Sequence, residues 1–487
     1  MLHSEKIELG GGGVFCYRRQ VMPPRQVRLD VSGETASTVT PLETARMGLP
    51  FSAQTQLRSI KDVLGAIADP LDLNVSVRLW NGDVVPIGRD VDGRYTIALS
   101  GPGVVGSLLR RPSLETLVRL YATGHIAFEG GDLMEFTEAL KTEKANRRRL
   151  KTISKTMLVK KTLPFLFAKT DAGDLSHQFA DDGVGRNESR RDNTDYIRFH
   201  YDVGNAFYKL FLGSEMQYTC AYFKDWDNSL DQAQRDKMDM ICRKLRLKPG
   251  ERMLDIGCGW GGLIRYAAQH YGVKAHGITL SQEQHDYAQT KIDELGLGDQ
   301  VSVEICDYAD HQGTYDKISS IGMSEHIGIA NYPRYFDKIN SMLRDRGIML
   351  NHAIARRAKK SKRDARKIRP ERKFILKYIF PGSELTPVGM TTDFLENSGF
   401  EVHDVESWRE HYALTLKYWC KNLSANRDEA IRLVGPERYR LWVAYMAGGS
   451  AGFSAGSIKI YQVVATKRAG KGLSGMPPTR ADLYRAA

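Results

Sequence analysis

The sequence is poor in cysteine and has no long apolar run. No stretch of 18 or more uncharged apolar residues occurs, which argues against a membrane-spanning helix. The first eight residues, MLHSEKIE, lack the apolar segment of a signal peptide. The six cysteines are scattered, with no CxxC pair and no histidine-rich partner, so they are interpreted as reduced thiols of a cytoplasmic protein. Neither a disulfide framework nor a metal site is predicted.

Positive charge is concentrated rather than spread evenly. The formal net charge is +12, but segments 141–169 and 356–373 each carry a surplus of nine positive charges, so the rest of the chain is mildly acidic. A single run of this kind is often only a solvated, flexible segment. Two such runs in one chain favour an anionic partner, either a membrane surface or nucleic acid.

The length of 487 residues predicts two or three domains. Segment 141–169 combines basic residues with an apolar stripe and a terminal Phe/Leu cluster, which is typical of an interfacial amphipathic helix or of a core-packing helix with a charged outer face. The predicted organisation is a poorly ordered segment (1–55), a small α+β domain (56–140), a basic amphipathic segment and linker (141–195), a catalytic domain (196–467) and a flexible tail (468–487).

The catalytic domain is built around the stretch PGERMLDIGCGWGG (249–262). A short apolar strand leads into a glycine-rich loop and then a helix, which is the opening of a nucleotide-binding α/β unit. Strands are predicted at 253–256, 273–279, 301–305, 316–321, 347–354, 400–406 and 458–466. Helices between the first five predict a parallel doubly wound sheet, and the last strand is expected to pair antiparallel.

The spacing of the glycines alone is compatible with either a nicotinamide dinucleotide or S-adenosylmethionine. Gly257, Gly259 and Gly262 satisfy G-x-G-x-x-G, but a nicotinamide enzyme should carry an acid at the end of the second strand, where Thr279 stands. Asp255 instead precedes the glycines, and Asp-x-Gly-x-Gly-x-Gly after an apolar strand is the pattern of S-adenosylmethionine-dependent methyltransferases. A dehydrogenase and a purely structural glycine turn are the weaker alternatives.

Several stretches, in order between about 200 and 465, resemble the cyclopropane-fatty-acyl-phospholipid synthases and the related mycolic acid cyclopropane synthases. They are HYDVGNAFY (200–208), MQYTCAYF (216–223), LDIGCGWGG (254–262), SIGMSEHIG (320–328), NHAI (351–354), KYIFPG (377–382) and HYALTL (411–416). The resemblance implies an α/β, doubly wound class I S-adenosylmethionine-dependent methyltransferase domain with a small N-terminal α+β domain. The likeness of the first 135 residues is weaker.

The resemblance also implies the roles of individual residues. Tyr218 and Thr219 would contact the methionine end of S-adenosylmethionine, Thr279 and Gln284 the ribose, and Asp307 and Tyr308 the adenine. The complete cofactor-binding set is Tyr218, Thr219, Asp255, Gly257, Gly259, Gly261, Thr279, Gln284, Asp307 and Tyr308. In this family a bound bicarbonate accepts the proton, and the matching positions are Cys220, Glu325, His352, Ile354 and Tyr412.

These implications predict an enzyme that transfers a methylene unit to the cis double bond of unsaturated phospholipid acyl chains. It would be cytoplasmic and peripherally associated with anionic head groups at the inner face of the membrane, with segment 356–373 as a docking element. Nucleic acid is not expected as a partner, and a homodimer is left open. The alternatives are a related enzyme that makes methylene- or methyl-branched chains and, more remotely, a non-catalytic membrane- or nucleic-acid-binding protein.

Overall fold

The computed structural model describes residues 52–140, 153–170, 204–358, 375–376, 379 and 383–484. The predicted disordered start, most of the linker before the catalytic domain, the beginning of the HYDVGNAFY stretch and most of the second basic run lie outside these residues. The described residues form two separate sheets.

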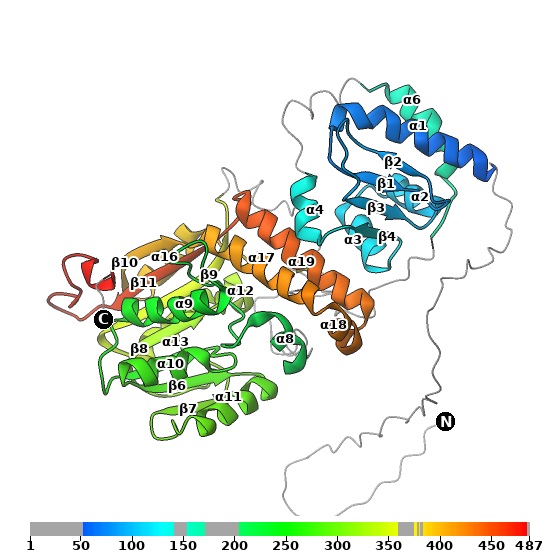
Figure 1. Ribbon diagram of the computed structural model, residues 1–487. Helices are drawn as coiled ribbons and strands as arrows, with labels where there is room; N and C mark the ends of the chain where they lie inside the picture. Colours follow the sequence, from blue (N-terminus) through cyan, green and yellow to red (C-terminus); the bar gives the residue numbers. More distant parts are fainter. Residues whose placement is uncertain are drawn as a thin grey trace, which may run out of the picture. The chain divides into compact units, whose positions relative to one another are not determined.

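The first sheet has four strands in the order β2-β1-β3-β4 (Figure 1). Asn81 and Gly82, a residue pair typical of hairpin turns, lie in the turn between the antiparallel strands β1 and β2. The elements of this part are α1 (Ala53–Leu71), β1 (Ser76–Arg78), β2 (Val84–Pro86), β3 (Thr96–Leu99), α2 (Pro102–Arg110), α3 (Leu114–Ala122), β4 (Ile126–Glu129) and α4 (Leu133–Ala139). The part is therefore a small α+β fold.

The described end of the first basic segment forms α6 (Lys155–Thr162) and the short 3₁₀ helix η2 (Leu163–Phe165). Phe165 is fully buried in the core of the small sheet, and the side chain of Lys161 forms an ion pair with Asp62 of α1. Val159 and Phe167 instead point into solvent, with 62% and 65% of their surface exposed. The segment therefore both packs on the small domain and presents apolar side chains outward.

The second sheet has seven strands in the order β10-β11-β9-β8-β5-β6-β7 (Figure 1). Strands β7, β6, β5, β8 and β9 run parallel, and β10 and β11 pair antiparallel, as predicted for the last strand. The strands are β5 (Arg252–Ile256), β6 (Lys274–Thr279), β7 (Val301–Ile305), β8 (Tyr315–Ile321), β9 (Leu343–Arg356), β10 (Phe400–Ser407) and β11 (Ile458–Lys467). The predicted doubly wound class is confirmed.

One predicted feature of this sheet is wrong. Helices were expected between all of the first five strands, but residues 306–314, between β7 and β8, contain only turns. This segment must pass two intervening strands and return along the length of a strand, a distance of roughly 20 Å. Nine residues in a helix span only about 14 Å, whereas an extended chain of the same length reaches about 30 Å.

The helices of this part cover the sheet and close one end of it. They are α8 (Asn205–Leu212), α9 (Leu230–Leu245), α10 (Gly262–Tyr271), α11 (Gln282–Glu294), α12 (Ser324–Ile327), η4 (Ile329–Asn331), α13 (Tyr332–Met342), α16 (Val388–Asn397), α17 (Arg409–Ala425), α18 (Arg427–Val434) and α19 (Pro436–Ser454). Helices α17 and α19 pack on each other, away from β7 and α11 (Figure 1). Among the described residues, no helix has the length and apolar character needed to span a membrane.

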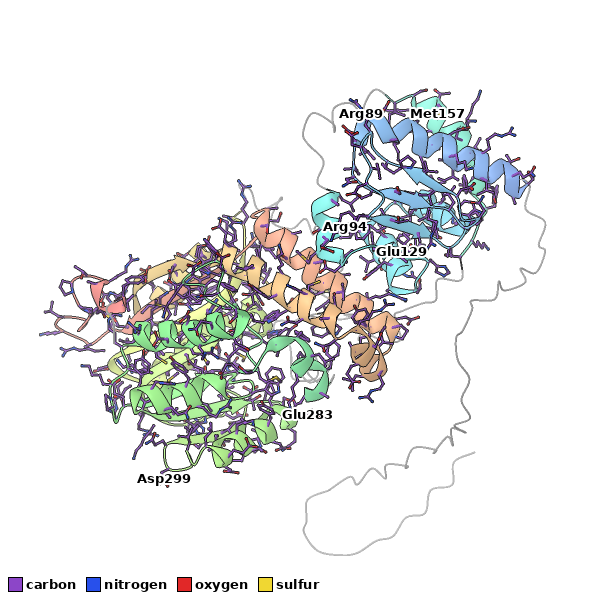
Figure 2. All side chains as sticks on the ribbon, in the orientation of Figure 1. Arg89, Arg94, Glu129, Met157, Glu283 and Asp299 are labelled. Atoms are coloured by element: carbon purple, nitrogen blue, oxygen red, sulfur yellow. The ribbon has the colours of Figure 1, made fainter. Side chains whose placement is uncertain are left out.

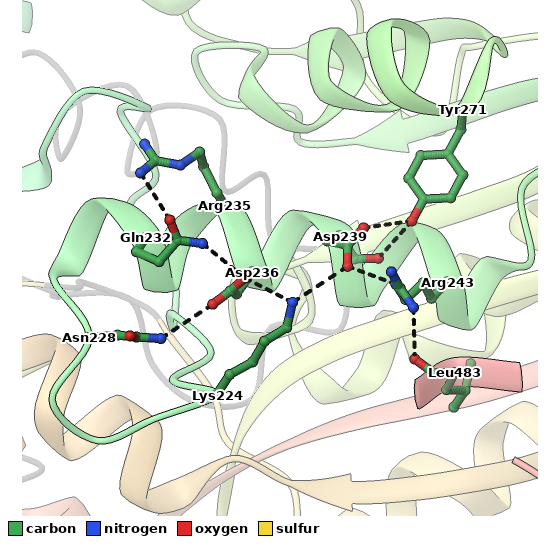
Figure 3. Close-up of polar contacts among 9 residues, drawn as sticks. All are labelled: Lys224, Asn228, Gln232, Arg235, Asp236, Asp239, Arg243, Tyr271 and Leu483. Atoms are coloured by element: carbon green, nitrogen blue, oxygen red, sulfur yellow. Dashed lines mark hydrogen bonds and ion pairs between the residues drawn. The ribbon is translucent and has the colours of Figure 1, made fainter. Parts of the chain in front are cut away.

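Polar contacts along one face hold α9 in place. Asp236 forms an ion pair with Lys224 at 2.9 Å, and Asp239 accepts hydrogen bonds from Arg243 and Tyr271, each at 2.7 Å (Figure 3). Ser229 caps the helix by accepting from the backbone N–H of Gln232, as its sequence predicts. These contacts leave the neighbouring face of α9 directed at the sheet.

The prediction of a flexible tail (468–487) is wrong for residues Ala481–Tyr484. Residues Ala481–Tyr484 form a 3₁₀ helix (η5) in which Leu483 is only 3% exposed. Asp482 pairs with Arg246 at 2.9 Å. Because Leu483 is a lone apolar residue in a polar stretch, the sequence shows no periodicity that would announce this contact.

Candidate active site

The glycine loop after β5 opens onto a cavity. Gly257 has φ +76°, and a Cβ at this position would lie 2.3 Å from the sulfur of Met323, so only glycine fits. Gly259 has φ +56°, and a Cβ there would meet no atom within 4 Å. The loop backbone is therefore packed on one side and faces open space on the other.

The cavity has a volume of about 550 Å³ and is lined mainly by apolar groups. The structure brings the entire predicted catalytic set into its wall, together with most of the predicted cofactor-binding set. The predicted residues that line it are Tyr218, Thr219, Cys220, Asp255, Gly257, Gly259, Gln284, Glu325, His352, Ile354 and Tyr412. A volume of this size suits a cofactor or ligand site.

The other four predicted cofactor residues do not line this cavity. The hydroxyl of Thr279 donates to the side-chain carbonyl of Gln284 at 2.8 Å. Gln284 lines the cavity, and Thr279 supports it from behind. Gly261 lies against Ala288 of α11. Asp307 accepts from a backbone N–H of its own turn, and Tyr308 lines a separate cavity of about 450 Å³.

Asp255, at the end of β5, is a buried acid with one defined partner. Its carboxylate accepts a hydrogen bond of 2.6 Å from the hydroxyl of Ser319 on β8. Burial raises the pKa of Asp255 to about 6, although Ser319 and the charge of Lys237 oppose this shift. Asp255 therefore fastens the glycine loop to the neighbouring strand.

Lys237 of α9 lines the cavity, although its sequence context predicts no role for it there. It is 1% exposed, and its ammonium donates to the side-chain carbonyl of Gln217 and, at 3.0 Å, to the hydroxyl of Thr219. Burial lowers the pKa of Lys237 to about 7. A cation that titrates near neutral pH thus stands behind the predicted methionine site.

Cys220 is completely buried beside this lysine. Its sulfur lies 3.3 Å from the carbonyl of Ala221 and 3.7 Å from that of Trp408. Burial raises the pKa of the Cys220 thiol well above its ordinary value, more than Lys237 lowers it. The sulfur is therefore a protonated, weak hydrogen-bond donor and not a nucleophilic thiolate.

His352 on β9 is held by a chain of three side chains. Its Nδ1 lies 3.2 Å from the amide nitrogen of Gln462 on β11, and the amide oxygen of Gln462 accepts from Lys244 at 2.7 Å. Lys244 is in turn paired with Glu406 of β10. Burial is the main cause that lowers the pKa of His352 well below its ordinary value, so the ring is neutral.

Glu325 and Ile354 both line the cavity and are hydrogen-bonded to each other. The backbone N–H of Ile354 donates to Oε1 of Glu325 at 2.6 Å. Glu325 thus occupies the backbone group that the family resemblance assigns to bicarbonate. Tyr412 of α17 completes this end of the cavity, with its ring 4.7 Å from that of Phe453 on α19.

Trp260, inside the glycine loop, connects three elements. Its indole N–H donates to the side-chain carbonyl of Asn205 at 2.6 Å, and its ring packs 5.0 Å from Tyr208. Asn205 also donates to the backbone carbonyl of Glu283 at 3.1 Å, at the start of α11 (Figure 2). The Asn-x-x-Tyr part of the 200–208 stretch therefore supports the loop and does not itself line the cavity.

Small residues of α19 widen the apolar end of the cavity. Gly448, Gly449, Ala451 and Gly452 line it, and a Cβ on Gly448 would meet nothing within 4 Å. Gly449 has no side chain, so no thiol is available at this position. The cavity is therefore lined by hydrogen-bonding groups together with apolar walls.

The residues present fit both of the predicted bound groups. Hydroxyl, amide and ammonium groups of Thr219, Gln217 and Lys237 can receive the carboxylate of a methionine moiety. For a small anion, the buried Nε2 of His352 has no hydrogen-bond partner among the described residues. Because Nδ1 accepts from Gln462, this Nε2 carries the proton and can donate.

This sheet order, glycine loop and cavity define a class I S-adenosylmethionine-dependent methyltransferase. Comparison with known sequences makes the assignment specific: the chain belongs to the mycolic acid cyclopropane synthetase family, whose profile matches residues 188–463. A probable fatty acid methyltransferase of Pseudomonas putida is 37% identical over 420 residues, covering 85% of this chain and 97% of that protein.

Other relatives and solved structures agree. A probable fatty acid methyltransferase of Mycobacterium tuberculosis is 37% identical over 398 residues, covering 80% of this chain and 91% of its own length. The cyclopropane synthase MmaA2 of M. tuberculosis superposes with a TM-score of 0.54 at 31% identity, covering 57% of this chain and 99% of that one. The mycolic acid cyclopropane synthase CmaA1, solved with SAH and CTAB, gives 0.54 at 32% identity, covering 57% and 100%. The family acts on lipid acyl chains.

Proposed function

We propose that the protein transfers a methylene unit from S-adenosylmethionine to the cis double bond of an unsaturated phospholipid acyl chain, forming a cyclopropane ring. The observation that carries this proposal is that Cys220, Glu325, His352 and Tyr412 all line a mainly apolar cavity that also contains the glycine loop. An acyl chain needs the apolar end, and the reacting carbons need the polar groups.

The chemistry requires such a mixed cavity. When bound, S-adenosylmethionine supplies a methyl group as its carbon–sulfur bond breaks, leaving a cation on the second carbon of the former double bond. Loss of a proton from the transferred methyl then closes the ring. Water would capture the cation, so the apolar walls from α17, α19 and β11 serve to exclude it.

Bicarbonate is the proposed proton acceptor. The Nε2–H of His352 and the thiol of Cys220 would donate to the anion, and the hydroxyl of Tyr412 would complete its binding. Glu325 would hold the β9 backbone in register through the N–H of Ile354. The neutral ring of His352 and the protonated Cys220 suit donation, since neither can compete with the anion as a base.

A membrane surface is the proposed source of the substrate. Four exposed apolar side chains follow one another around η2, with 42% or more of their surface exposed, and lysines flank them. We define this membrane-docking surface by Val159, Leu163, Leu166, Phe167 and the exposed lysines Lys155, Lys160 and Lys169. Apolar insertion combined with basic residues is the recognised requirement for binding an anionic bilayer. The second basic run, 356–373, falls mostly outside the described residues and stays a prediction.

A second candidate is transfer that yields a methylene- or methyl-branched chain. The same cation, after losing a different proton, gives a chain with a methylene branch or with a methyl branch on a retained double bond. The relatives in P. putida and M. tuberculosis, which match nearly along their full lengths, are named probable fatty acid methyltransferases, and this favours the candidate.

Mass spectrometry tests both proposals. The full chain is expressed in a host that makes unsaturated phospholipids but no ring or branch, and the acyl chains are analysed for added mass, ring position and residual double bonds. A gain of one CH₂ with a ring supports the first proposal, and a branched chain supports the second. Unmodified lipids, with the protein folded and binding SAH, would contradict both. In vitro, the proposed acceptor predicts that turnover drops in bicarbonate-free buffer and returns on addition of bicarbonate.

A further inference from the structure

A group of metal-ligating side chains lies outside the cavity just described. His276 of β6, Glu304 of β7 and His311 of the 306–314 turn each offer a ligand atom, and these three atoms lie within 4.8 Å of one another. Among the described residues, no other group of three His, Cys, Asp or Glu side chains meets this condition. None of the three lines the cofactor cavity.

Two of the three separations match a metal site better than a hydrogen-bonded cluster, and the third, between the two imidazole nitrogens, is within 4.8 Å. Nε2 of His276 and Nδ1 of His311 are each 3.3 Å from the same oxygen, Oε2 of Glu304. A tetrahedral ion with bonds of about 2.0–2.1 Å to nitrogen and oxygen separates its ligand atoms by about 3.3–3.4 Å. Direct N–H···O hydrogen bonds are most often about 2.9–3.0 Å long, so both contacts are long for that purpose.

Outer partners fix the direction of both imidazole rings. Nδ1 of His276 lies 2.8 Å from the hydroxyl of Ser302, and Nε2 of His311 lies 2.8 Å from the hydroxyl of Tyr315. A hydroxyl can accept the N–H of each ring, which leaves the lone pair of the opposite nitrogen directed at the shared centre. Histidine ligands in metal sites are held by outer partners of this kind.

The backbone explains why these side chains meet. His276 pairs with Ser302, and Ile278 with Glu304, in the parallel register of β6 and β7, so Glu304 lies two residues from the partner of His276 and on the same face. His311 returns over this face because the turn folds back, with its backbone N–H donating to the carbonyl of Asp307 at 3.1 Å. The two imidazole rings are nearly parallel, with their centroids 5.1 Å apart.

Solvent can reach the group from one side. The side chain of Glu304 is 51% exposed and that of His276 is 21% exposed, whereas His311 is 7% exposed. An ion can therefore enter past the carboxylate, and a water molecule can serve as the fourth ligand. We propose that His276, Glu304 and His311 bind one divalent transition-metal ion of the Zn²⁺ type.

Such an ion joins β6 and β7 to the 306–314 turn. The turn itself contains no helix. The turn begins at Asp307 and Tyr308, the residues predicted to contact adenine. Metal binding would therefore stiffen the chain beside the cofactor site without entering it. This consequence rests on the proposed cofactor contacts; the metal site itself does not.

Direct titration tests the site. Full-length protein without a polyhistidine tag is stripped with a chelator, and Zn²⁺ is titrated in competition with a chromophoric chelator; Co²⁺ is used in parallel because its visible absorption reports tetrahedral coordination. The wild type is expected to bind one equivalent with Kd below about 10 µM and to gain thermal stability with Zn²⁺. His276→Ala, His311→Ala and Glu304→Gln should each lose this binding.

Matched controls make the result decisive. Tyr315→Phe removes only an outer partner and should weaken binding about 10-fold or more. His285→Ala and Cys306→Ser alter a histidine and a thiol outside the group and should bind as the wild type does. Glu304 is half exposed, so Glu304→Gln tests the site without a folding defect. A Kd of the wild type for Zn²⁺ above about 100 µM would overturn the proposal, as would unchanged Zn²⁺ binding in Glu304→Gln and both alanine variants. The affinity for SAH is measured alongside, so that this outcome is kept separate from any failure of the methyltransferase assignment.

Discussion

The Nδ1 atom of His352 lies 3.2 Å from the amide nitrogen of Gln462, and this contact determines which nitrogen of the imidazole carries the proton. The ammonium of Lys244 can only donate, so the oxygen of Gln462 must face it, at 2.7 Å. The nitrogen of Gln462 must then face His352 and donate to Nδ1. The proton of the neutral ring is therefore on Nε2 of a residue that lines the cavity.

Replacing Gln462 with methionine should slow turnover while leaving cofactor binding intact. The side chain keeps its approximate shape but loses the donor that selects the Nε2–H tautomer. We expect kcat to fall about 10- to 100-fold, with KM for S-adenosylmethionine unchanged. Thr466→Val, on the same strand, is the matched control. An unchanged kcat in Gln462→Met would show that the tautomer does not matter for the reaction.

Glu325→Ala and His352→Ala should abolish product formation. Both residues line the cavity, but neither forms part of the glycine loop. We therefore expect the Kd of SAH, measured by calorimetry, to stay within about 3-fold of the wild type, while the rate drops by at least about 100-fold. Variants that retain full activity would refute the role of this wall in proton removal.

The sequence predicted the parts of the site that follow local rules. The strand, glycine loop and helix around Gly257 have a strict order and spacing, and the other predicted strands are confirmed because alternating apolar runs determine them. Cys220 and His352, more than a hundred residues apart, line the same cavity. Family resemblance, and not any spacing rule, grouped them in the sequence.

The missed residues depend on tertiary contacts. Lys237 and Lys244 are seven residues apart on α9 and share one face with Ala233 and Met240, so lysine occupies an apolar stripe. A lysine at an apolar position of a helix is a signal in the sequence that the side chain is buried and has a polar partner, because lysine is rarely buried without one. Their partners lie on other strands and loops, and a single sequence carries no measure of those distances. The contact of Gln462 with His352, across 110 residues, is of the same kind.

Lys237 should make cofactor affinity depend on pH. Its pKa is lowered to about 7, so the side chain is an ammonium below that pH and a neutral amine above it. If it receives the cofactor carboxylate, SAH affinity should fall as pH rises above about 7, by at most 10-fold per pH unit. Lys237→Met should bind more weakly at pH 6 and lose the dependence. Lys248→Met, an exposed lysine, is the control; a flat wild-type profile between pH 6 and 9 would contradict the assignment.

A side chain at Gly448 should block the apolar end of the cavity. The position lines the cavity, and a Cβ there meets open space. Gly448→Phe should therefore fold, because phenylalanine is a better helix former than glycine, and should occupy the volume expected for the acyl chain. Activity on long-chain substrates should fall about 10-fold or more, with SAH binding unchanged. Gly448→Ala should be nearly silent, and full activity in Gly448→Phe would move the acyl chain elsewhere.

The membrane-docking surface should respond to charge placed on its apolar side chains. Leu166 and Phe167 are 42% and 65% exposed, and inserting either into a bilayer is worth at most about 1.5–3 kcal/mol. The double variant Leu166→Asp, Phe167→Asp should therefore reduce sedimentation with phosphatidylglycerol-containing vesicles about 10-fold or more, and activity on vesicles should fall with it. Activity on the same lipid dispersed in detergent should persist, because the catalytic wall is untouched. Leu473→Asp is the control, since Leu473 is 87% exposed outside this surface. An equal loss in both variants would mean that general charge repulsion, and not insertion at this surface, governs binding.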